Sequence, residues 1–209
     1  MKRIALAAVL MFGGGVAQAD SDLITNGGFE SPYIGYIALG PGSNFISGWT
    51  TVLSGVEFFD ATSLGGGAPG SGRMAVDLAN YVYLTGGGLE QTISTAAGQE
   101  YDLTFFAGNS ASSGRDGTGI VKLTIDGVTT DYATAVAATG AMAWKQITHS
   151  FVAASSSTTV RFWNDQNPFA HFAIIDGIGA VPAAPVPEPG TWAMVLGGLG
   201  LVAAARRRS

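Results

Sequence analysis

Hydrophobic and polar residues alternate in short runs through the middle of the chain. The runs RMAVDLA (73–79), YDLTFFAG (101–108), IVKLTIDG (120–127) and TTVRFWND (158–165) each place apolar residues at every second position. Because alternate side chains of a β-strand point to the same face, each run predicts a strand with one buried face. The residues expected to face the core are Met74, Val76, Leu78, Tyr101, Leu103, Phe105, Ala107, Val121, Leu123, Ile125, Val160 and Phe162.

Turn residues separate these runs. Asp126-Gly127 precedes a further run, VTTDYATA (128–135), and a two-residue Asp-Gly turn is a strong β-hairpin signal. AHFAIIDGI (170–178) supplies a last strand. About eight such strands without an amphipathic helix between them predict an all-β fold, a single antiparallel β-sandwich. The Gly- and Ser-rich stretches 64–72 and 109–119 contain few apolar residues, so we expect them to be mobile loops.

The N-terminal residues have the three parts of a secretory signal peptide. Lys2 and Arg3 precede an apolar run at 4–16, and the small-residue site Ala17-Gln18-Ala19 follows. The apolar run is too short to cross a bilayer comfortably. We therefore expect residues 1–19 to be removed by signal peptidase, with cleavage before Asp20.

The C-terminal end has a different composition from the rest of the chain. Residues 182–189 are rich in proline, which makes a stiff linker with little capacity to form a core. Residues 190–205 are uncharged and mostly apolar, and Arg206, Arg207 and Arg208 follow. Basic residues after an apolar helix tend to stay cytoplasmic. The pattern predicts a domain at 20–181 and a hydrophobic helix at 190–209 that holds it transiently outside the inner membrane.

Composition narrows the chemistry further. Between Asp20 and Glu188 there are five basic and fifteen acidic residues, a net charge of about −10. A domain of that charge repels phosphate backbones, so nucleic acid is not an expected partner. The chain has no cysteine, which excludes thiolate catalysis, cysteine-ligated zinc and iron–sulfur clusters.

Several aromatic residues lie on the outward side of the predicted strands. Trp163 has the opposite parity to Val160 and Phe162, and Trp144 is out of phase with the apolar positions of its own run. Exposed aromatic rings flanked by polar groups are typical of carbohydrate-binding sites. The candidate carbohydrate-binding residues are Trp163, Trp144, Tyr81, Tyr83, Arg161 and Asp165. The alternative for any one of them is an anchor in the core.

Catalysis has weaker support in the sequence. The chain has two histidines, of which His149 falls on an inward position, and no Gly-x-Ser-x-Gly motif. Glycoside hydrolysis needs only two carboxyl groups across a cleft, and Glu57, Asp60, Asp77 and Glu90 leave that alternative open. We expect no catalytic residues.

The order of elements at the C-terminus is specific. Pro187-Glu188-Pro189, then an apolar run, then Arg206–Arg208 resembles the PEP-CTERM sorting signal of Gram-negative bacteria. The resemblance implies processing by an exosortase and a place at the cell surface or in the extracellular matrix, where such proteins accompany an extracellular polysaccharide.

The middle of the chain resembles bacterial choice-of-anchor C domains, relatives of plant cell-wall proteins that bind pectin. The matching segments are 26–30 (NGGFE), 46–49, 70–79, 89–109, 144–153 and 173–181, in the family's order. The resemblance implies a galactose-binding-like jelly roll, an architecture shared with carbohydrate-binding modules. It also implies a structural Ca²⁺ held by Glu30 and Asp176, with the Gly28 carbonyl as a further ligand. The alternative is that both acidic residues hydrogen-bond to backbone in turns.

Together these patterns favour an exported, non-catalytic domain that associates with extracellular polysaccharide. The main alternative is a structural matrix or cell-surface protein without a defined glycan ligand, and a glycan-active hydrolase is a further one.

Overall fold

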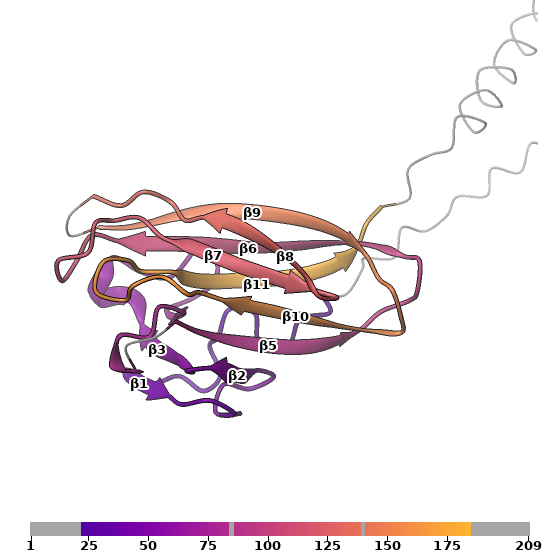
Figure 1. The fold of residues 1–209 in the computed structure, drawn as a ribbon, viewed down its shortest axis with the longest axis horizontal. Coiled ribbons are helices and arrows are strands. Elements are labelled where there is room, and N and C mark those ends of the chain that lie inside the picture. Colours follow the sequence, from indigo (N-terminus) through magenta and orange to yellow (C-terminus); the bar gives the residue numbers. More distant parts are fainter. Residues whose placement is uncertain (1–21, 84–85, 139–140, 185–209) are drawn as a thin grey trace, which may run out of the picture.

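Two antiparallel sheets packed face to face form the part of the chain that the computed structural model describes, residues 22–83, 86–138 and 141–184 (Figure 1). The larger sheet has the order β1-β3-β4-β11-β6-β9 and the smaller one β2-β5-β10-β7-β8. The strands are β1 (Tyr36–Leu39), β2 (Thr50–Leu53), β3 (Val56–Asp60), β4 (Met74–Asp77), β5 (Gly87–Ser94), β6 (Glu100–Ser110), β7 (Ile120–Ile125), β8 (Val128–Ala133), β9 (Met142–Val152), β10 (Ser157–Trp163) and β11 (Ile174–Pro182). The predicted all-β sandwich is confirmed.

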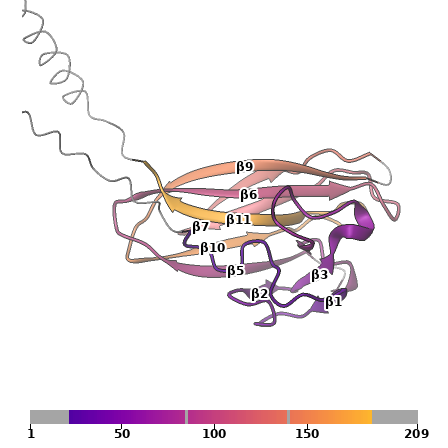
Figure 2. The same cartoon turned by 180° about the vertical axis from the view of Figure 1, so that it is seen from behind.

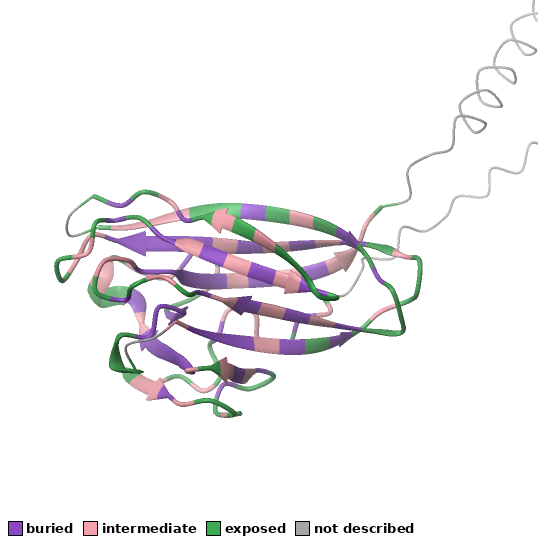
Figure 3. Ribbon diagram, in the orientation of Figure 1, coloured by how far each residue is buried: buried purple, intermediate pink, exposed green. Residues whose placement is uncertain are grey.

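The core lies between the sheets and contains the residues that the alternation predicts. Buried and less buried residues alternate along β6, β7 and β10, as the coloured ribbons of Figure 3 show. Phe105 of β6 packs edge-on against Phe162 of β10, with ring centroids 4.9 Å apart, which joins the two sheets at their centre. Trp49 is buried beside Phe162 and Phe29, and its Nε1 donates to the Asn26 carbonyl oxygen at 3.1 Å.

The predicted Asp-Gly hairpin is confirmed. Asp126 and Gly127 join β7 to β8 with φ angles of 49° and 81°, and Ile125 faces Val128 across the turn. Positive φ at both central positions is the requirement of a type I′ turn.

The first third of the domain departs from the expectation of about eight strands. β1 and β2 are only four residues long, and β3 is buried on both faces, so none of the three shows a clear alternation. The described residues therefore contain eleven strands. The expected loop 109–119 also begins too early, because Asn109 and Ser110 are fully buried and end β6.

A second, smaller apolar cluster covers the outer face of the six-stranded sheet. It consists of Phe59, Ala61, Ala75, Phe172 and Ile174, with Leu64, Met142 and Trp144 packed against it. The short 3-10 helix η1 (Ala61–Leu64) lies over this face, as the reverse view in Figure 2 shows, and η2 (Tyr81–Tyr83) follows β4. Strands β3 and β4 are consequently buried on both sides.

The predicted signal peptide, 1–19, the predicted hydrophobic helix with its arginines, 190–209, and residues 185–189 of the predicted linker lie outside the described residues. Within the described ranges no helix is long and apolar enough to cross a membrane.

Candidate functional site

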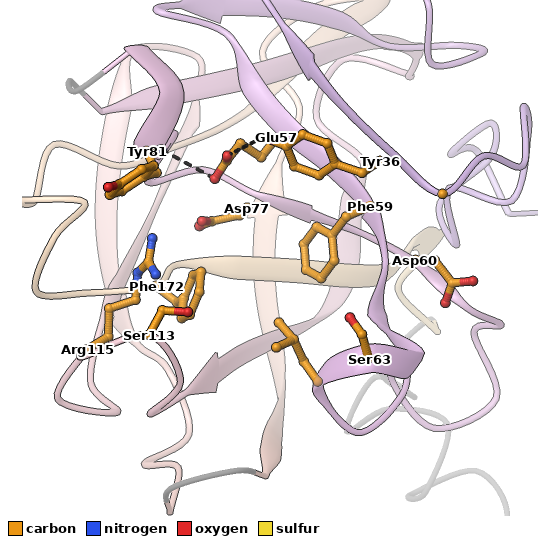
Figure 4. Close-up of a pocket in the computed structure, with 12 residues that line it drawn as sticks. Tyr36, Glu57, Phe59, Asp60, Ser63, Asp77, Tyr81, Ser113, Arg115 and Phe172 are labelled. Atoms are coloured by element: carbon orange, nitrogen blue, oxygen red, sulfur yellow. Dashed lines mark hydrogen bonds between the residues drawn. The ribbon is translucent and has the colours of Figure 1, made fainter.

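A cavity of about 470 Å³ opens on the outer face of the six-stranded sheet (Figure 4). Four of its twelve lining residues are aromatic, and several charged side chains converge in it. Its lining includes Tyr36, Glu57, Phe59, Asp77, Tyr81, Arg115 and Phe172. An apolar concave surface with a few convergent polar groups is the usual form of a small-molecule site.

Two carboxyl groups reach this cavity from neighbouring strands. Glu57 of β3 and Asp77 of β4 are directly opposite each other in the antiparallel register. Val56, Phe58, Met74 and Val76 point into the main core, so the alternation of each strand turns Glu57 and Asp77 to the outer face.

The Glu57 carboxylate has defined partners. The Tyr36 hydroxyl donates to Oε1 at 2.6 Å, and the Tyr81 backbone N–H donates to Oε2 at 3.3 Å. Burial raises the pKa of the Tyr36 phenol, and its hydrogen bond to the Glu57 carboxylate raises it further. Tyr36 therefore remains a hydrogen-bond donor, which fixes Glu57 as the acceptor of the pair.

The Asp77 carboxyl is in a different environment. The residue is 1% exposed, and Oδ1 accepts hydrogen bonds from Ala79 N at 2.9 Å and Ala173 N at 3.2 Å. Oδ2 is buried and has no hydrogen-bond partner among the described residues. Burial raises the pKa of Asp77 to about 7, and the Glu57 charge raises it too, against the smaller opposing effects of the two N–H donors and of Arg115.

Arg115 approaches the same space from the loop after β6. Its Nε donates to the Pro168 carbonyl oxygen at 3.1 Å, and its guanidinium carbon lies 3.8 Å from the centre of the Phe172 ring. The same carbon is 5.3 Å from the centre of the Tyr81 ring, whose other neighbour is Phe169, edge-on at 5.0 Å. These cation–π contacts hold one positive charge beside the two carboxyl groups.

The rim of the cavity carries a third carboxylate that is already engaged. Asp60 accepts hydrogen bonds from Thr62, from the Tyr33 hydroxyl at 2.7 Å and from Arg73 Nη2 at 2.7 Å. The hydrogen bonds from Thr62, ahead of those from Tyr33 and the Arg73 charge, hold the pKa of Asp60 below its ordinary value. Asp60 thus caps η1 and anchors the rim.

The predicted carbohydrate-binding residues do not form one site. Tyr81 lines the cavity, and Tyr83, on the same short helix η2, is 45% exposed. Trp144 lies on the same outer face, but its ring packs against Gly108, where a Cβ atom would be only 2.4 Å away, and its Nε1 donates to the Gly66 carbonyl oxygen. It therefore helps to close the small apolar cluster.

Trp163 and Arg161 lie on the outer face of the five-stranded sheet, on the opposite side of the sandwich. Trp163 Nε1 donates to Thr124 Oγ1 at 2.9 Å, and Lys122 Nζ is 5.1 Å from the centre of the ring. Arg161 pairs with Glu90 at 2.7 Å, and Asp165 lies 3.7 Å from Lys122 Nζ. The polar groups around Trp163 are thus largely engaged with one another.

The three residues predicted to hold calcium gather around one loop. Both oxygens of Asp176 accept hydrogen bonds, Oδ2 from Ala68 N at 2.8 Å and Oδ1 from Ser71 Oγ at 2.5 Å and Gly177 N at 2.7 Å. Oε1 of Glu30 accepts from Arg73 N and Met74 N at 2.7 and 2.6 Å. Gly28 lies against the Ser71 carbonyl oxygen.

Both oxygens of Asp176 and Oε1 of Glu30 thus already accept hydrogen bonds from the protein. No group of three or more acidic, histidine or cysteine residues suited to a metal occurs in the part of the chain that the structure describes. Burial raises the pKa of Asp176 to about 6. The hydrogen-bonded alternative accounts for the same residues, and calcium remains a prediction.

Sequence reasoning identified part of the cavity. Glu57 and Asp77 were candidates only as carboxylates, although a single acidic residue within an apolar run, as in VEFFD or MAVDLA, is a signal of its own. Tyr36, Arg115 and Phe172 carry no comparable signal. Tyr36 comes from β1, and Arg115 and Phe172 reach the cavity only because the loops before β7 and before β11 fold over the sheet.

Two family models match this chain. The model of DUF642, described as a protein of unknown function, matches residues 22–178. The chain belongs to the DUF642 family. Residues 185–209 match the PEP-CTERM protein-sorting motif, which implies exosortase-dependent export and sorting to the cell surface. The finer resemblance to choice-of-anchor C domains stays a prediction. No curated protein matches this DUF642 chain.

Solved structures share the architecture at low sequence identity. An arabinose-bound GH51 α-L-arabinofuranosidase is 13% identical over 77% of this chain, with a TM-score of 0.51, and the match spans 26% of that enzyme. A CBM61 structure in complex with β-1,4-galactotriose is 16% identical, covers 78% of this chain and 99% of its own, and has a TM-score of 0.49. A family 35 carbohydrate binding module from Clostridium thermocellum is 14% identical, covers 72% and 100%, and has a TM-score of 0.43. At this identity the likeness concerns the fold alone.

Proposed function

We propose that this DUF642 protein is a non-catalytic carbohydrate-binding protein and that the glycan binds in the cavity on the outer face of the six-stranded sheet. The observation that carries the proposal is the convergence of Glu57, Asp77 and Arg115 between aromatic walls in one cavity of about 470 Å³. That volume falls within the range of roughly 300–1,000 Å³ found for small-molecule sites.

The residue types suit a sugar. The C–H-rich faces of a pyranose or furanose ring pack against aromatic rings, and Tyr36 and Tyr81 are 57% and 45% exposed at the mouth. Sugar hydroxyls need both donors and acceptors, which Arg115 and Glu57 supply. Perturbed pKa values at Asp77 and Tyr36 are a further mark of a functional site.

The sorting motif indicates that the protein encounters its glycan at the cell surface. A PEP-CTERM signal implies delivery to the cell surface, and the resemblance noted in the sequence implies a partner polysaccharide outside the cell. We propose that polysaccharide as the ligand. The second candidate, a matrix or coat protein without a defined glycan, makes no use of the polar groups inside the cavity.

Hydrolysis is the remaining alternative. Glu90 lies on the other sheet and is paired with Arg161, so among the four carboxyl groups considered only Glu57 and Asp77 stand side by side and free of an arginine bond. A reducing-sugar assay on any glycan that binds separates binding from cleavage, and we expect no release of product.

The test is binding of the full chain to a glycan array and to the producing cell's own exopolysaccharide. Glu57→Gln removes a charged acceptor and is expected to weaken binding roughly ten- to hundredfold. Glu90→Gln is the matched control, because it makes the same change on the opposite sheet, and it is expected to bind as wild type. Failure of the wild-type chain to bind any glycan contradicts the proposal.

A further inference from the structure

One buried carboxyl oxygen of the cavity, Asp77 Oδ2, makes no hydrogen bond within the described residues. By contrast, Oδ1 of the same carboxyl accepts two backbone N–H groups. A buried polar atom without a partner costs free energy, which a hydrogen bond to a bound ligand would recover. In Figure 4 the Asp77 carboxyl lies between Glu57, Tyr81 and Arg115, and Asp77 is one of the residues that line the cavity.

We propose that Asp77 is a specificity-determining residue that binds in its neutral form and donates a hydrogen bond from Oδ2 to the ligand. The Glu57 carboxylate, opposite it in the β3–β4 register, accepts from the same ligand hydroxyl or from the adjacent one. The inference rests on the proposed function and names its ligand class, a neutral glycan. A hydroxyl group of that glycan accepts a hydrogen bond from Asp77 and donates one to Glu57.

The surroundings of Asp77 raise its pKa to about 7, so that a substantial fraction of the carboxyl is neutral near pH 7. From β3 the Glu57 charge opposes ionisation of Asp77, and complete burial opposes it more strongly. From the loop after β6 Arg115 acts in the other direction, with a smaller effect. Tyr81 of η2 and Tyr36 of β1 complete the titratable surroundings, and the neighbouring β11 residue, Ile174, is apolar.

The same surroundings disfavour an acidic sugar. The lining residues include one cation, Arg115, together with Glu57 and the Arg73-paired Asp60. A uronate would place another negative charge beside Glu57 and would require Asp77 to stay neutral against two carboxylates. A neutral sugar hydroxyl adds no negative charge beside Glu57 or Asp77. It can accept a hydrogen bond from Asp77 and donate one to Glu57.

The experiment is calorimetric titration of the full chain with L-arabinose, β-1,4-galactotriose and the neutral and uronic-acid glycans that the array identifies, at pH 6 and pH 8. If only the protonated form of Asp77 binds, the wild-type affinity falls about tenfold between these pH values. Asp77→Asn keeps a donor at this position but cannot titrate, so its affinity is expected to be independent of pH, whatever its absolute value.

His171→Gln is a control at a polar side chain that is next in sequence to the lining residue Phe172. Its Nδ1 contacts Asp116 and Thr118 and not Asp77, so the variant should keep the wild-type pH dependence. Equal affinity of the wild type at both pH values, a pH dependence that persists in Asp77→Asn, or preference for uronic acids overturns the inference while leaving carbohydrate binding intact. Absence of binding to any glycan at either pH overturns the proposed function, and the inference with it.

Discussion

Asp77 is completely buried beside the Glu57 carboxylate, and its raised pKa makes the stability of the folded chain depend on pH. Its pKa rises from 3.8 to about 7 on folding, so the folded chain binds this proton more tightly than the unfolded chain does. The stabilisation is therefore full below about pH 4 and is lost as the pH rises to 7. Asp176, with its pKa raised to about 6, acts in the same direction over a narrower range.

We predict that the free energy of unfolding of the wild type falls by an amount on the order of 3 kcal/mol between pH 4 and pH 7.5 through Asp77. Urea unfolding at several pH values measures it. In Asp77→Asn this contribution should disappear, and the separate fall due to Asp176 should remain and end near pH 6. A variant that retains the full wild-type slope would show that Asp77 is ionised in the folded protein.

At the scale of single elements, the β7–β8 hairpin gives a clean test of the turn. Gly127 has a φ of 81° and open space around it, so an added methyl group meets no atom but forces an unfavourable backbone angle. Gly127→Ala is expected to destabilise the domain by ~1–2 kcal/mol.

Gly35→Ala is the matched control for the hairpin variant. Gly35 also has nothing within 4 Å of an added Cβ, and its φ lies outside the left-handed region. Its replacement should leave stability unchanged or raise it by ~0.4–1 kcal/mol. Equal effects of the two substitutions in thermal unfolding would argue against the type I′ turn.

The calcium prediction for the residues around the loop 67–73 can be tested by thermal unfolding with and without a chelator. Asp176 and Glu30 accept hydrogen bonds from this loop and from Met74, so the hydrogen-bonded alternative predicts a melting temperature that is unchanged by a chelator and lowered by several degrees in Asp176→Asn. A fall in melting temperature on chelation that added Ca²⁺ reverses would instead support the cation implied by the family resemblance.

Strands with one solvent-facing side were predictable because their residues alternate, as in β6, β7 and β10. β3 is covered on both sides and its run VEFFD does not alternate, so the sequence does not reveal which of its residues faces which layer, whereas the alternation in β4 correctly identifies Met74 and Val76 as core residues. The cavity depends on this second layer, which is why Glu57 and Asp77 were recognisable as acidic residues but not as a pair. Arg115 and Phe172 enter from loops, whose paths follow from packing rather than from local pattern.

At the scale of the whole molecule, the sandwich separates the predicted aromatic residues onto opposite surfaces. Tyr81 belongs to the cavity on the six-stranded sheet, whereas Trp163 lies on the five-stranded sheet beside Lys122. A single binding site cannot include both, so the two surfaces are rival locations for the glycan.

The ends of the mature chain test the sorting prediction. We expect mass spectrometry of the protein recovered from producing cells and their matrix to find an N-terminus at Asp20 and a C-terminus near Pro187–Pro189, without the apolar run and Arg206–Arg208. Recovery of a matrix-located chain that retains all residues to Ser209 would contradict processing at the PEP-CTERM motif.

The central claim is that the cavity, and not the Trp163 surface, binds glycan. Calorimetric titration of the full chain with the glycan selected by the array, using wild type, Tyr81→Ala and Trp163→Ala, tests it directly. We predict that Tyr81→Ala weakens binding about tenfold through loss of ring stacking, and that Trp163→Ala binds as wild type. Binding lost in Trp163→Ala and unchanged in Tyr81→Ala would contradict the account.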